Sequence, residues 1–235
     1  MKIREIITLL ILGIAIPTFG QYHIIGIKGG INWTNINSTN FLSSRSKIDN
    51  GTGVNAGLIY EYSFNKRFNL GIDLLFLQKG FRREFIILEE DGIRYLVSGK
   101  IDSEFDYDYF SIPIKGGVSI GNKFLGFVNL GIIPSILNKA TITTKLIDPV
   151  FTSSGIGYEE ETTQDQTDKI TRFDFSGLIE LGLNYNFFDH YSLFASVGYQ
   201  YSFTSITNQN YFPDGEVRHT AIVLSFGIKY ALRKG

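Results

Sequence analysis

Apolar and aromatic side chains alternate with small or polar ones along most of this chain, in runs of about ten residues between positions 26 and 230. An alternation with a period of two is typical of β-strands whose two faces meet different environments. The connections between the runs are alternately long and short. Together these features predict a transmembrane β-barrel, in which the apolar face of each strand contacts lipid and the polar face lies inside.

Eight runs can be followed, and an even number of strands puts both termini on one side of the membrane. The runs cover residues 25–33, 53–64, 68–77, 109–120, 124–137, 173–187, 191–203 and 221–230. Short turns at 65–67, 121–123 and 188–190 are predicted to face the periplasm. Long connections at 34–50, 80–104, 138–171 and 204–218 are predicted to lie outside the cell. The predicted fold is therefore an all-β, eight-stranded antiparallel up-and-down barrel of the cell outer membrane.

One residue is unusual for a strand interior. Pro113 lies within the fourth run and cannot donate a hydrogen bond to a β-ladder. We therefore expect a bulge at this position.

The first twenty residues have the features of a secretory signal peptide. Basic Lys2 and Arg4 precede an apolar stretch over residues 6–16, which is shorter than the ~20 residues of a membrane-spanning helix. Cleavage is predicted between Gly20 and Gln21. We expect a signal peptide over 1–20 and one barrel domain over 21–235, with a membrane anchor helix as the alternative for the first segment.

Composition argues against several functional classes. Removal of the signal peptide leaves 20 basic and 22 acidic residues, which gives no indication of nucleic-acid binding. The chain has no Cys and no phosphate-loop, dinucleotide, serine-hydrolase or zinc-protease motif, so we expect no cofactor and no metal. A soluble lipocalin-like carrier, with the apolar face inside, is the alternative fold. We favour the membrane barrel because the polar face is mostly Gly, Ser and Asn, which suit a narrow interior.

Charged residues of both signs fall on inward-facing positions of the predicted strands. An unpaired ion in a dry interior is costly, so these side chains are predicted to form salt bridges with one another. An eight-stranded barrel is only wide enough for its own side chains, which favours a closed interior over an ion or proton path. The predicted lumen network comprises Lys28, Glu61, Asp73, Lys115, Asp174, Glu180 and Lys229.

The alternation continues where the third strand would leave the membrane. It extends beyond Gly80 to an Asp91–Gly92 pair, which is a hairpin signal between strands, and then resumes. We expect a ribbon over residues 81–97 whose unpaired edges and apolar side chains are available to a partner protein. A ribbon that only braces the other loops is the alternative. The candidate partner-binding residues are Phe81, Phe85, Ile87, Ile93 and Tyr95.

Two other groups of residues have weaker chemical implications. Five acidic residues between 159 and 168 lack the glycine-containing loop of a calcium site, so we expect a solvated acidic loop. His219 lies at an inward position near the outer rim, within reach of Ser and carboxylate side chains from other strands. Small outer-membrane barrels include lipid-modifying hydrolases that use such groups, so an enzyme of that class is an alternative function.

Four segments resemble the PorT-like family of small outer-membrane β-barrels. They are Tyr109–Ile114, Phe127–Gly131, Phe173–Leu178 and Leu224–Tyr230, and the similarity extends over about residues 22–230. In the first segment an aromatic residue precedes an Ile-Pro pair, as in that family. The family's namesake belongs to a protein-secretion system, so the resemblance implies an accessory role there and provides no catalytic residues.

We therefore expect a non-enzymatic outer-membrane barrel with a structural or accessory role, in secretion or in adhesion through the ribbon at 81–97. Its expected partners are outer-membrane lipid and other cell-envelope or secretion proteins.

Overall fold

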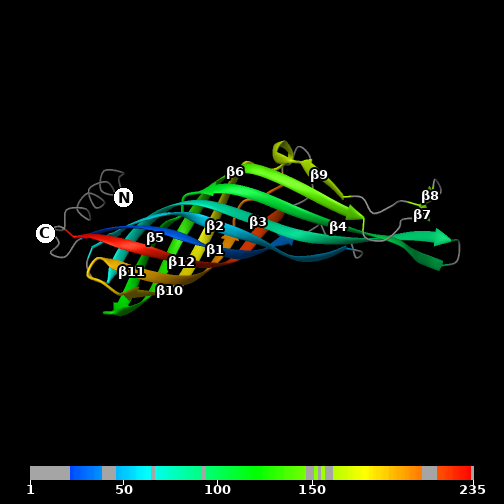
Figure 1. The fold of residues 1–235 in the computed structure, drawn as a ribbon. Helices are drawn as coiled ribbons and strands as arrows, with labels where there is room; N and C mark the ends of the chain where they lie inside the picture. The colour runs from blue at the N-terminus through cyan, green and yellow to red at the C-terminus, as the bar shows by residue number, and fades with distance from the viewer. Residues whose placement is uncertain are drawn as a thin grey trace, which may run out of the picture.

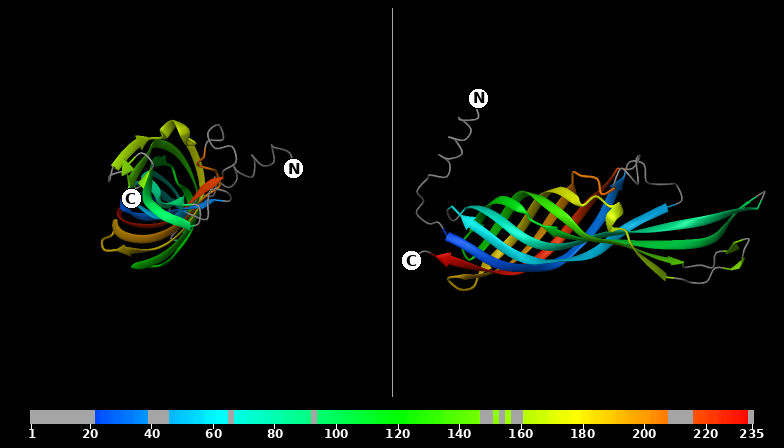
Figure 2. Two further views of the ribbon diagram at one scale, coloured as in Figure 1. Left: turned by 90° about the vertical axis from the view of Figure 1, so that its right-hand side faces the viewer. Right: turned by 90° about the horizontal axis from the view of Figure 1, so that it is seen from above.

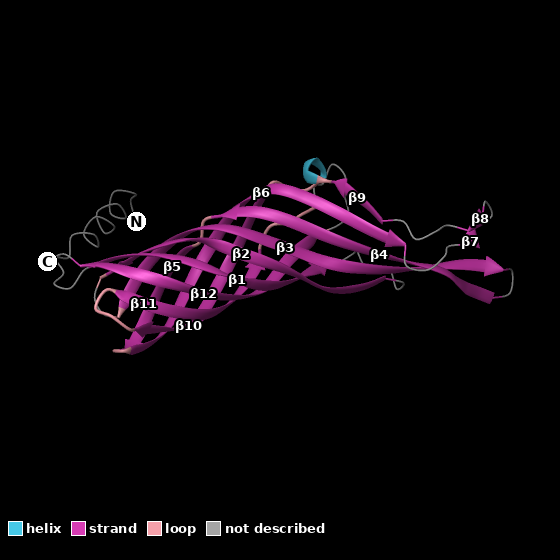
Figure 3. Ribbon diagram, in the orientation of Figure 1, coloured by secondary structure: helices cyan, strands magenta, loops and turns pink. Residues whose placement is uncertain are grey.

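The computed structural model describes residues 22–38, 46–64, 67–91, 94–146, 151–152, 155–156, 161–207 and 216–233. The predicted cleavage site at Gly20 and Gln21 lies outside these residues, so the division into signal peptide and barrel domain stays a prediction. Most of the described residues are in β-strands (Figure 3). The helix η1 (Thr167–Lys169) is a single 3-10 turn, and no helix in the described part is long and apolar enough to cross a membrane.

Antiparallel strands form a closed ring (Figures 1 and 2). The strands of the ring are β1 (Tyr22–Ser38), β2 (Ser46–Ser63), β3 (Phe68–Asp91), β4 (Arg94–Ser111), β5 (Ile114–Gly121), β6 (Phe124–Leu146), β10 (Phe173–Asn186), β11 (Tyr191–Ser202) and β12 (Val217–Arg233). Apart from β4 and β5, each strand pairs with the next strand of the ring along the chain, and the pairing of β1 with β12 closes the ring. Closure leaves no edge inside the membrane.

β4 and β5 are two parts of one strand. Only Ile112 and Pro113 separate them, both parts pair with β3 and β6, and the register is the same on both sides of the interruption. The carbonyl oxygen of Pro113 accepts a hydrogen bond from the N–H of Asp73 at 3.0 Å. The predicted bulge is therefore wrong, because Pro113 removes one donor without inserting a residue. With β4 and β5 counted together, the described residues form the predicted eight-stranded up-and-down barrel.

The outer wall of the ring is apolar. In β1 the side chains of Ile27 and Trp33 are 57% and 39% exposed, whereas the neighbouring Asn32 is fully buried. Other exposed apolar residues around the ring are Leu58, Leu70, Ile114, Leu130, Leu181, Leu193 and Phe226. The lipocalin-like alternative is wrong, because it requires the apolar face to lie inside. An apolar wall of this extent is suited to lipid.

Several strands extend beyond the ring at its outer end. β3 and β4 remain paired as far as Asp91 and Arg94, which confirms the predicted ribbon, and in Figure 2 they project beyond the ring. β6 continues beside β4 to Leu146, and β9 (Glu161–Asp165) pairs with β6. Residues 46–50 of β2 pair with β3. We call these parts the extracellular sheet, which comprises residues 46–50, 78–91, 94–108, 139–146 and 161–165.

The predicted long connections at 34–50 and 138–171 are wrong where strands replace them, whereas the strands within 80–104 belong to the predicted ribbon. Charged residues alternate with apolar ones there, and a charged outward face is unsuitable for lipid. In water such a face is compatible with a strand, because cross-strand ion pairs stabilise it. Arg82 and Glu104 form such a pair at 3.0 Å. A separate two-stranded sheet contains β7 (Phe151–Thr152) and β8 (Gly155–Ile156).

Leu181 lies near the middle of the lipid-facing wall, between Val128 and Val197 of the flanking strands. We predict that Leu181→Arg destabilises the barrel in lipid vesicles by ~2–4 kcal/mol, and that Phe173→Arg at the outer end of β10 costs ~0–1 kcal/mol. The difference is expected because the free-energy penalty for a lipid-facing cation is largest at the bilayer centre and becomes smaller toward the interfaces. Urea unfolding followed by Trp33 fluorescence measures both values, and equal penalties would contradict this position for the membrane.

Candidate functional site

Ion pairs fill the middle of the barrel interior. Asp73 of β3 accepts hydrogen bonds from two ammonium groups, Lys28 Nζ at 2.6 Å and Lys115 Nζ at 2.9 Å. Lys115 also pairs with Glu180 of β10 at 3.3 Å. None of these four side chains is more than 7% exposed. The pairs therefore link adjacent strands (β3 and β5) and strands separated by one other strand of the ring (β1 and β3, β5 and β10).

Two further ion pairs lie on either side of this group. Toward the short turns, Lys229 donates to both carboxylate oxygens of Glu61, at 2.8 and 3.0 Å. Toward the outer end, Lys79 pairs with Asp174 at 2.6 Å. The hydroxyl groups that also donate to Asp174 are those of Ser176, Ser202 and Thr204.

All seven residues of the predicted lumen network lie in these pairs. The sequence prediction omits Lys79, which has the same inward parity as Asp73, because the predicted third strand ends at residue 77. Four lysines face four carboxylates, and each has an opposite charge at 3.3 Å or less. A balanced set of this kind avoids the cost of an unpaired buried ion.

Two aromatic rings contact the Lys229 ammonium, and two glycines leave the space that these rings occupy. Its ammonium lies 5.2 Å from the ring centre of Phe127 and 4.7 Å from that of Phe194. A Cβ atom at Gly182 would come within 2.3 Å of the Phe127 ring, and one at Gly227 within 2.4 Å of the Phe194 ring. The absence of these side chains makes room for both rings, which attract the cation through their π-faces.

Apolar side chains close the outer end of the interior. Ile170 and Ile206, from the segments after η1 and β11, pack there against residues of the surrounding strands. The buried members are Phe81, Tyr107, Tyr109, Leu137, Ala140, Ile170, Ile206 and Val217. A cavity of about 60 Å³ remains beside them. In the described residues the lumen is thus closed by ion pairs in its middle and by apolar packing at its outer end.

The candidate partner-binding residues lie in different surroundings. Phe81 is 2% exposed and stacks on Phe105 with 4.4 Å between ring centres, so the prediction that it is available to a partner is wrong. It points inward because the apolar interior continues past the membrane. Phe85 is 36% exposed on the extracellular sheet. Ile93 and the side chains of Ile87 and Tyr95 lie outside the described residues, although the backbones of Ile87 and Tyr95 pair within the hairpin.

His219 does not form a catalytic arrangement. Its side chain is 1% exposed and packs edge-on against Tyr107 and Tyr109. Neither ring nitrogen has a hydrogen-bond partner among the described residues. A histidine base needs a bonded nucleophile and a group that orients it. The hydroxyl of Ser202 and the carboxylate of Asp174 bond to each other instead, at 3.1 Å.

Carboxylates form a row along the outward face of β4, outside the membrane. Glu104 pairs with Arg82, and Asp108 accepts a hydrogen bond from Gln78 Nε2 at 3.1 Å. Asp106 lies between these two carboxylates and forms no ion pair within the described part of the chain. Partial burial, together with the charges of Glu104 and Asp108, raises the pKa of Asp106.

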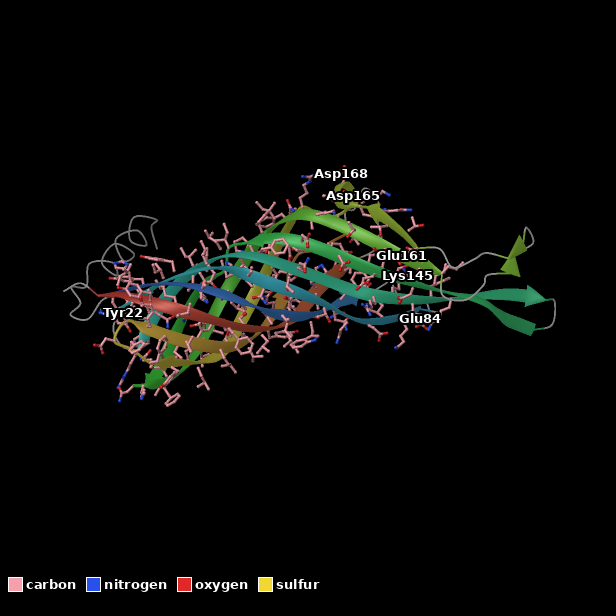
Figure 4. The ribbon with its side chains drawn as sticks, in the orientation of Figure 1. Tyr22, Glu84, Lys145, Glu161, Asp165 and Asp168 are labelled. Carbon is pink, nitrogen blue, oxygen red and sulfur yellow. The ribbon has the colours of Figure 1, made fainter. Side chains whose placement is uncertain are left out.

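The acidic residues of the predicted acidic loop are paired or bonded where the structure describes them. Glu161 of β9 pairs with Lys145 at 2.9 Å, and these residues lie on the extracellular sheet with Glu84 (Figure 4). Asp168 pairs with Arg172. Among the described residues no three His, Cys, Asp or Glu side chains are grouped as metal ligands.

Residues 19–208 match the family described as "Outer membrane protein beta-barrel domain". The chain belongs to this family. It is therefore a β-barrel of the cell outer membrane. No curated relative matches the chain at a significant level.

Solved structures that are similar to this chain include the following three. Ail, the attachment invasion locus protein of Yersinia pestis, is 20% identical, with 89% of this chain and 98% of that chain covered and a TM-score of 0.38. OprG from Pseudomonas aeruginosa is 12% identical, with coverage of 92% and 98% and a TM-score of 0.45. Neisserial surface protein A is 10% identical, with coverage of 90% and 99% and a TM-score of 0.43.

Lys229→Met would leave Glu61 buried without its cation. We predict that this substitution lowers the free energy of unfolding by ~3–5 kcal/mol, the usual cost of breaking a buried ion pair from one side. The double variant Glu61→Gln/Lys229→Met leaves no unpaired charge and should recover part of the loss. Urea unfolding of Glu61→Gln, of Lys229→Met and of the double variant measures the coupling energy between the two residues. Strictly additive losses of unfolding free energy would contradict the prediction.

The raised pKa of Asp106 makes stability depend on pH. The folded protein binds the Asp106 proton more tightly than the unfolded chain, so ionisation of this carboxyl weakens the fold. We predict that the wild type loses stability relative to Asp106→Asn as the pH rises from ~3.9 through the raised pKa. Below that window the difference should be constant. Denaturation midpoints over a pH series test this, and a difference independent of pH would contradict it.

Proposed function

We propose that this barrel is a non-enzymatic accessory protein that presents its extracellular sheet to a partner protein of the cell envelope. The observation that carries the proposal is the continuation of β3, β4 and β6 beyond the membrane above a closed interior. A closed lumen leaves the exposed surfaces as the places where the barrel meets other molecules. The His219 imidazole, which is buried and has no hydrogen-bond partner in the part of the chain that the structure describes, supports a role without catalysis.

The extracellular sheet has two edges that support binding by strand addition. Residues 46–50 of β2 pair with β3, but the pairing of β2 with β1 ends at Gly51. At the other edge β9 pairs with β6 and with no further strand among the described residues. Free backbone N–H and C=O groups at such edges pair with an extended segment of a partner, and nearby side chains select that segment.

Resemblance to the PorT-like family supports a more specific role in protein secretion. Its four segments lie in β4 and β5, β6, β10 and β12, which are parts of the barrel wall. The barrel would then anchor the extracellular sheet beside an export complex. Adhesion through the same sheet is the competing outcome of the test below.

Shortening the β3–β4 hairpin tests the proposal. Ile86 and Lys100 face each other in register, so replacement of residues 87–99 by Asn-Gly closes the hairpin with a two-residue turn. We predict that cells with this variant, like a deletion strain, lose proteins from the cell surface and the medium, because the partner no longer finds its binding surface. Quantitative mass spectrometry of both fractions measures the loss.

Arg82→Gln is the control variant, because it removes one ion pair of the sheet and keeps the hairpin. SDS gel mobility with and without boiling shows whether each variant is a folded barrel. Normal export in the deletion strain would contradict the secretion role. Loss of surface attachment with normal export would favour adhesion instead.

A further inference from the structure

An apolar cavity lies at the base of the extracellular sheet. Its volume is about 60 Å³, and its wall consists almost entirely of carbon atoms. Strands β3, β4 and β6 provide part of the wall, and the segments around η1 and after β11 provide most of the rest. The apolar residues of the wall include Phe81, Phe105, Ala140, Ile142, Ile170 and Ile206.

The cavity has the size of one aliphatic side chain. A water-sized group needs roughly 10–15 Å³ of such volume, so a cavity of about 60 Å³ holds about four to six of these groups. The side chain of Leu or Ile matches this size, whereas small-molecule sites usually have volumes of about 300–1,000 Å³. Because a carbon wall offers water few hydrogen bonds, the cavity favours a hydrocarbon group over water.

The cavity is open to solvent on the side of the extracellular sheet. Phe105 of β4 and Ile142 of β6 face each other in register, and both are only half-buried. Ile101 and Leu146 lie farther along the same face of these two strands and are also half-buried. This face therefore leads from solvent into the cavity, and a segment that lies on it can place a side chain inside.

A cation lies at the rim of the cavity. Lys169 contributes to the wall, is exposed and forms no ion pair within the ranges that the structure describes. Two carboxylates close to it in the sequence are engaged by other residues. Asp165 accepts hydrogen bonds from the N–H and the hydroxyl of Thr167, and Asp168 pairs with Arg172 at 2.9 Å. Lys169 is therefore available to a carboxylate from another molecule.

We propose that a partner protein binds the extracellular sheet by inserting one side chain of the size of Leu or Ile into this cavity, next to an acidic residue that pairs with Lys169. This inference rests on the proposed function and adds the chemistry by which the partner is recognised. Gln164 of β9 faces Ile142 in register, so a segment that pairs with the edge of β9 lies close to the cavity mouth. Binding energy in interfaces is concentrated in desolvated pockets of this kind.

Nuclear magnetic resonance of the methyl-labelled barrel in dimyristoylphosphatidylcholine nanodiscs tests the site. The probes are acetyl-Asp-Leu-amide and acetyl-Asp-Gly-amide. We expect saturable shifts of the Ile142, Ile170 and Ile206 methyl signals with the leucyl probe and no saturable shift with the glycyl probe. Lys169→Gln should weaken binding of the leucyl probe by about two- to fivefold, the range expected for an exposed ion pair.

Ala140→Leu fills the cavity from its wall, because Ala140 is 1% exposed and lines it. This variant should bind the leucyl probe at least about tenfold more weakly than the wild type, since the added carbon atoms occupy the space of the probe. In cells it should lose the same surface proteins as the variant with the shortened hairpin. Ala56→Leu is the matched control, because Ala56 is exposed on the outer wall of β2, and it should resemble the wild type in both experiments.

Three results of the titration would overturn the proposal: no saturable shift with the leucyl probe, an equal response to the glycyl probe, or unchanged affinity in Ala140→Leu. If Ala140→Leu does not fold, as judged by gel mobility, the comparison of the two probes on the wild type decides. If the shortened hairpin causes loss of surface proteins and folded Ala140→Leu does not, the anchor is wrong and the proposed function stands. Normal surface proteins in the deletion strain would instead contradict the proposed function.

Discussion

A strand in lipid must satisfy every backbone polar group within the sheet, and this constraint underlies the rest of the structure. The ring meets it by pairing each strand with its neighbours and β1 with β12. In the closed ring, the side chains on one face of every strand point outward and those on the other face point into a narrow interior. Charged side chains on the inward face are then brought together away from water, so they are stable only when paired, as Asp73 is with Lys28 and Lys115.

Beyond the membrane the same strands meet a different solvent, and their outward face changes accordingly. Along β4 the outward residues change from Phe110, which is 58% exposed, to Asp108, Asp106 and Glu104. The inward face remains apolar over this stretch, where Phe105 and Tyr107 continue the buried cluster. The sheet therefore extends from the barrel on strands that are continuous with the barrel wall, and the buried cluster continues between them.

The interior is divided into three chemically distinct regions. Apolar packing closes the outer end, balanced ion pairs fill the middle, and a cavity of about 470 Å³ with polar and charged lining residues lies at the short-turn end. Lys229 marks the boundary of the last region, since it is held by Glu61 and by two aromatic rings. The ion pairs in the middle therefore separate this cavity from the extracellular sheet.

The alternation of residue types by itself determined which residues face lipid and which face inward, because side-chain direction in a strand is a local property with a period of two. It thereby identified seven of the eight charged residues that are paired inside the barrel. Only the tertiary structure decided where the strands end, so it alone brought Lys79 to Asp174 and buried Phe81. It also showed that Pro113 keeps the register and that neither ring nitrogen of His219 has a hydrogen-bond partner among the described residues. These features depend on which distant strands lie beside a residue, and that choice is made by pairing across the whole ring.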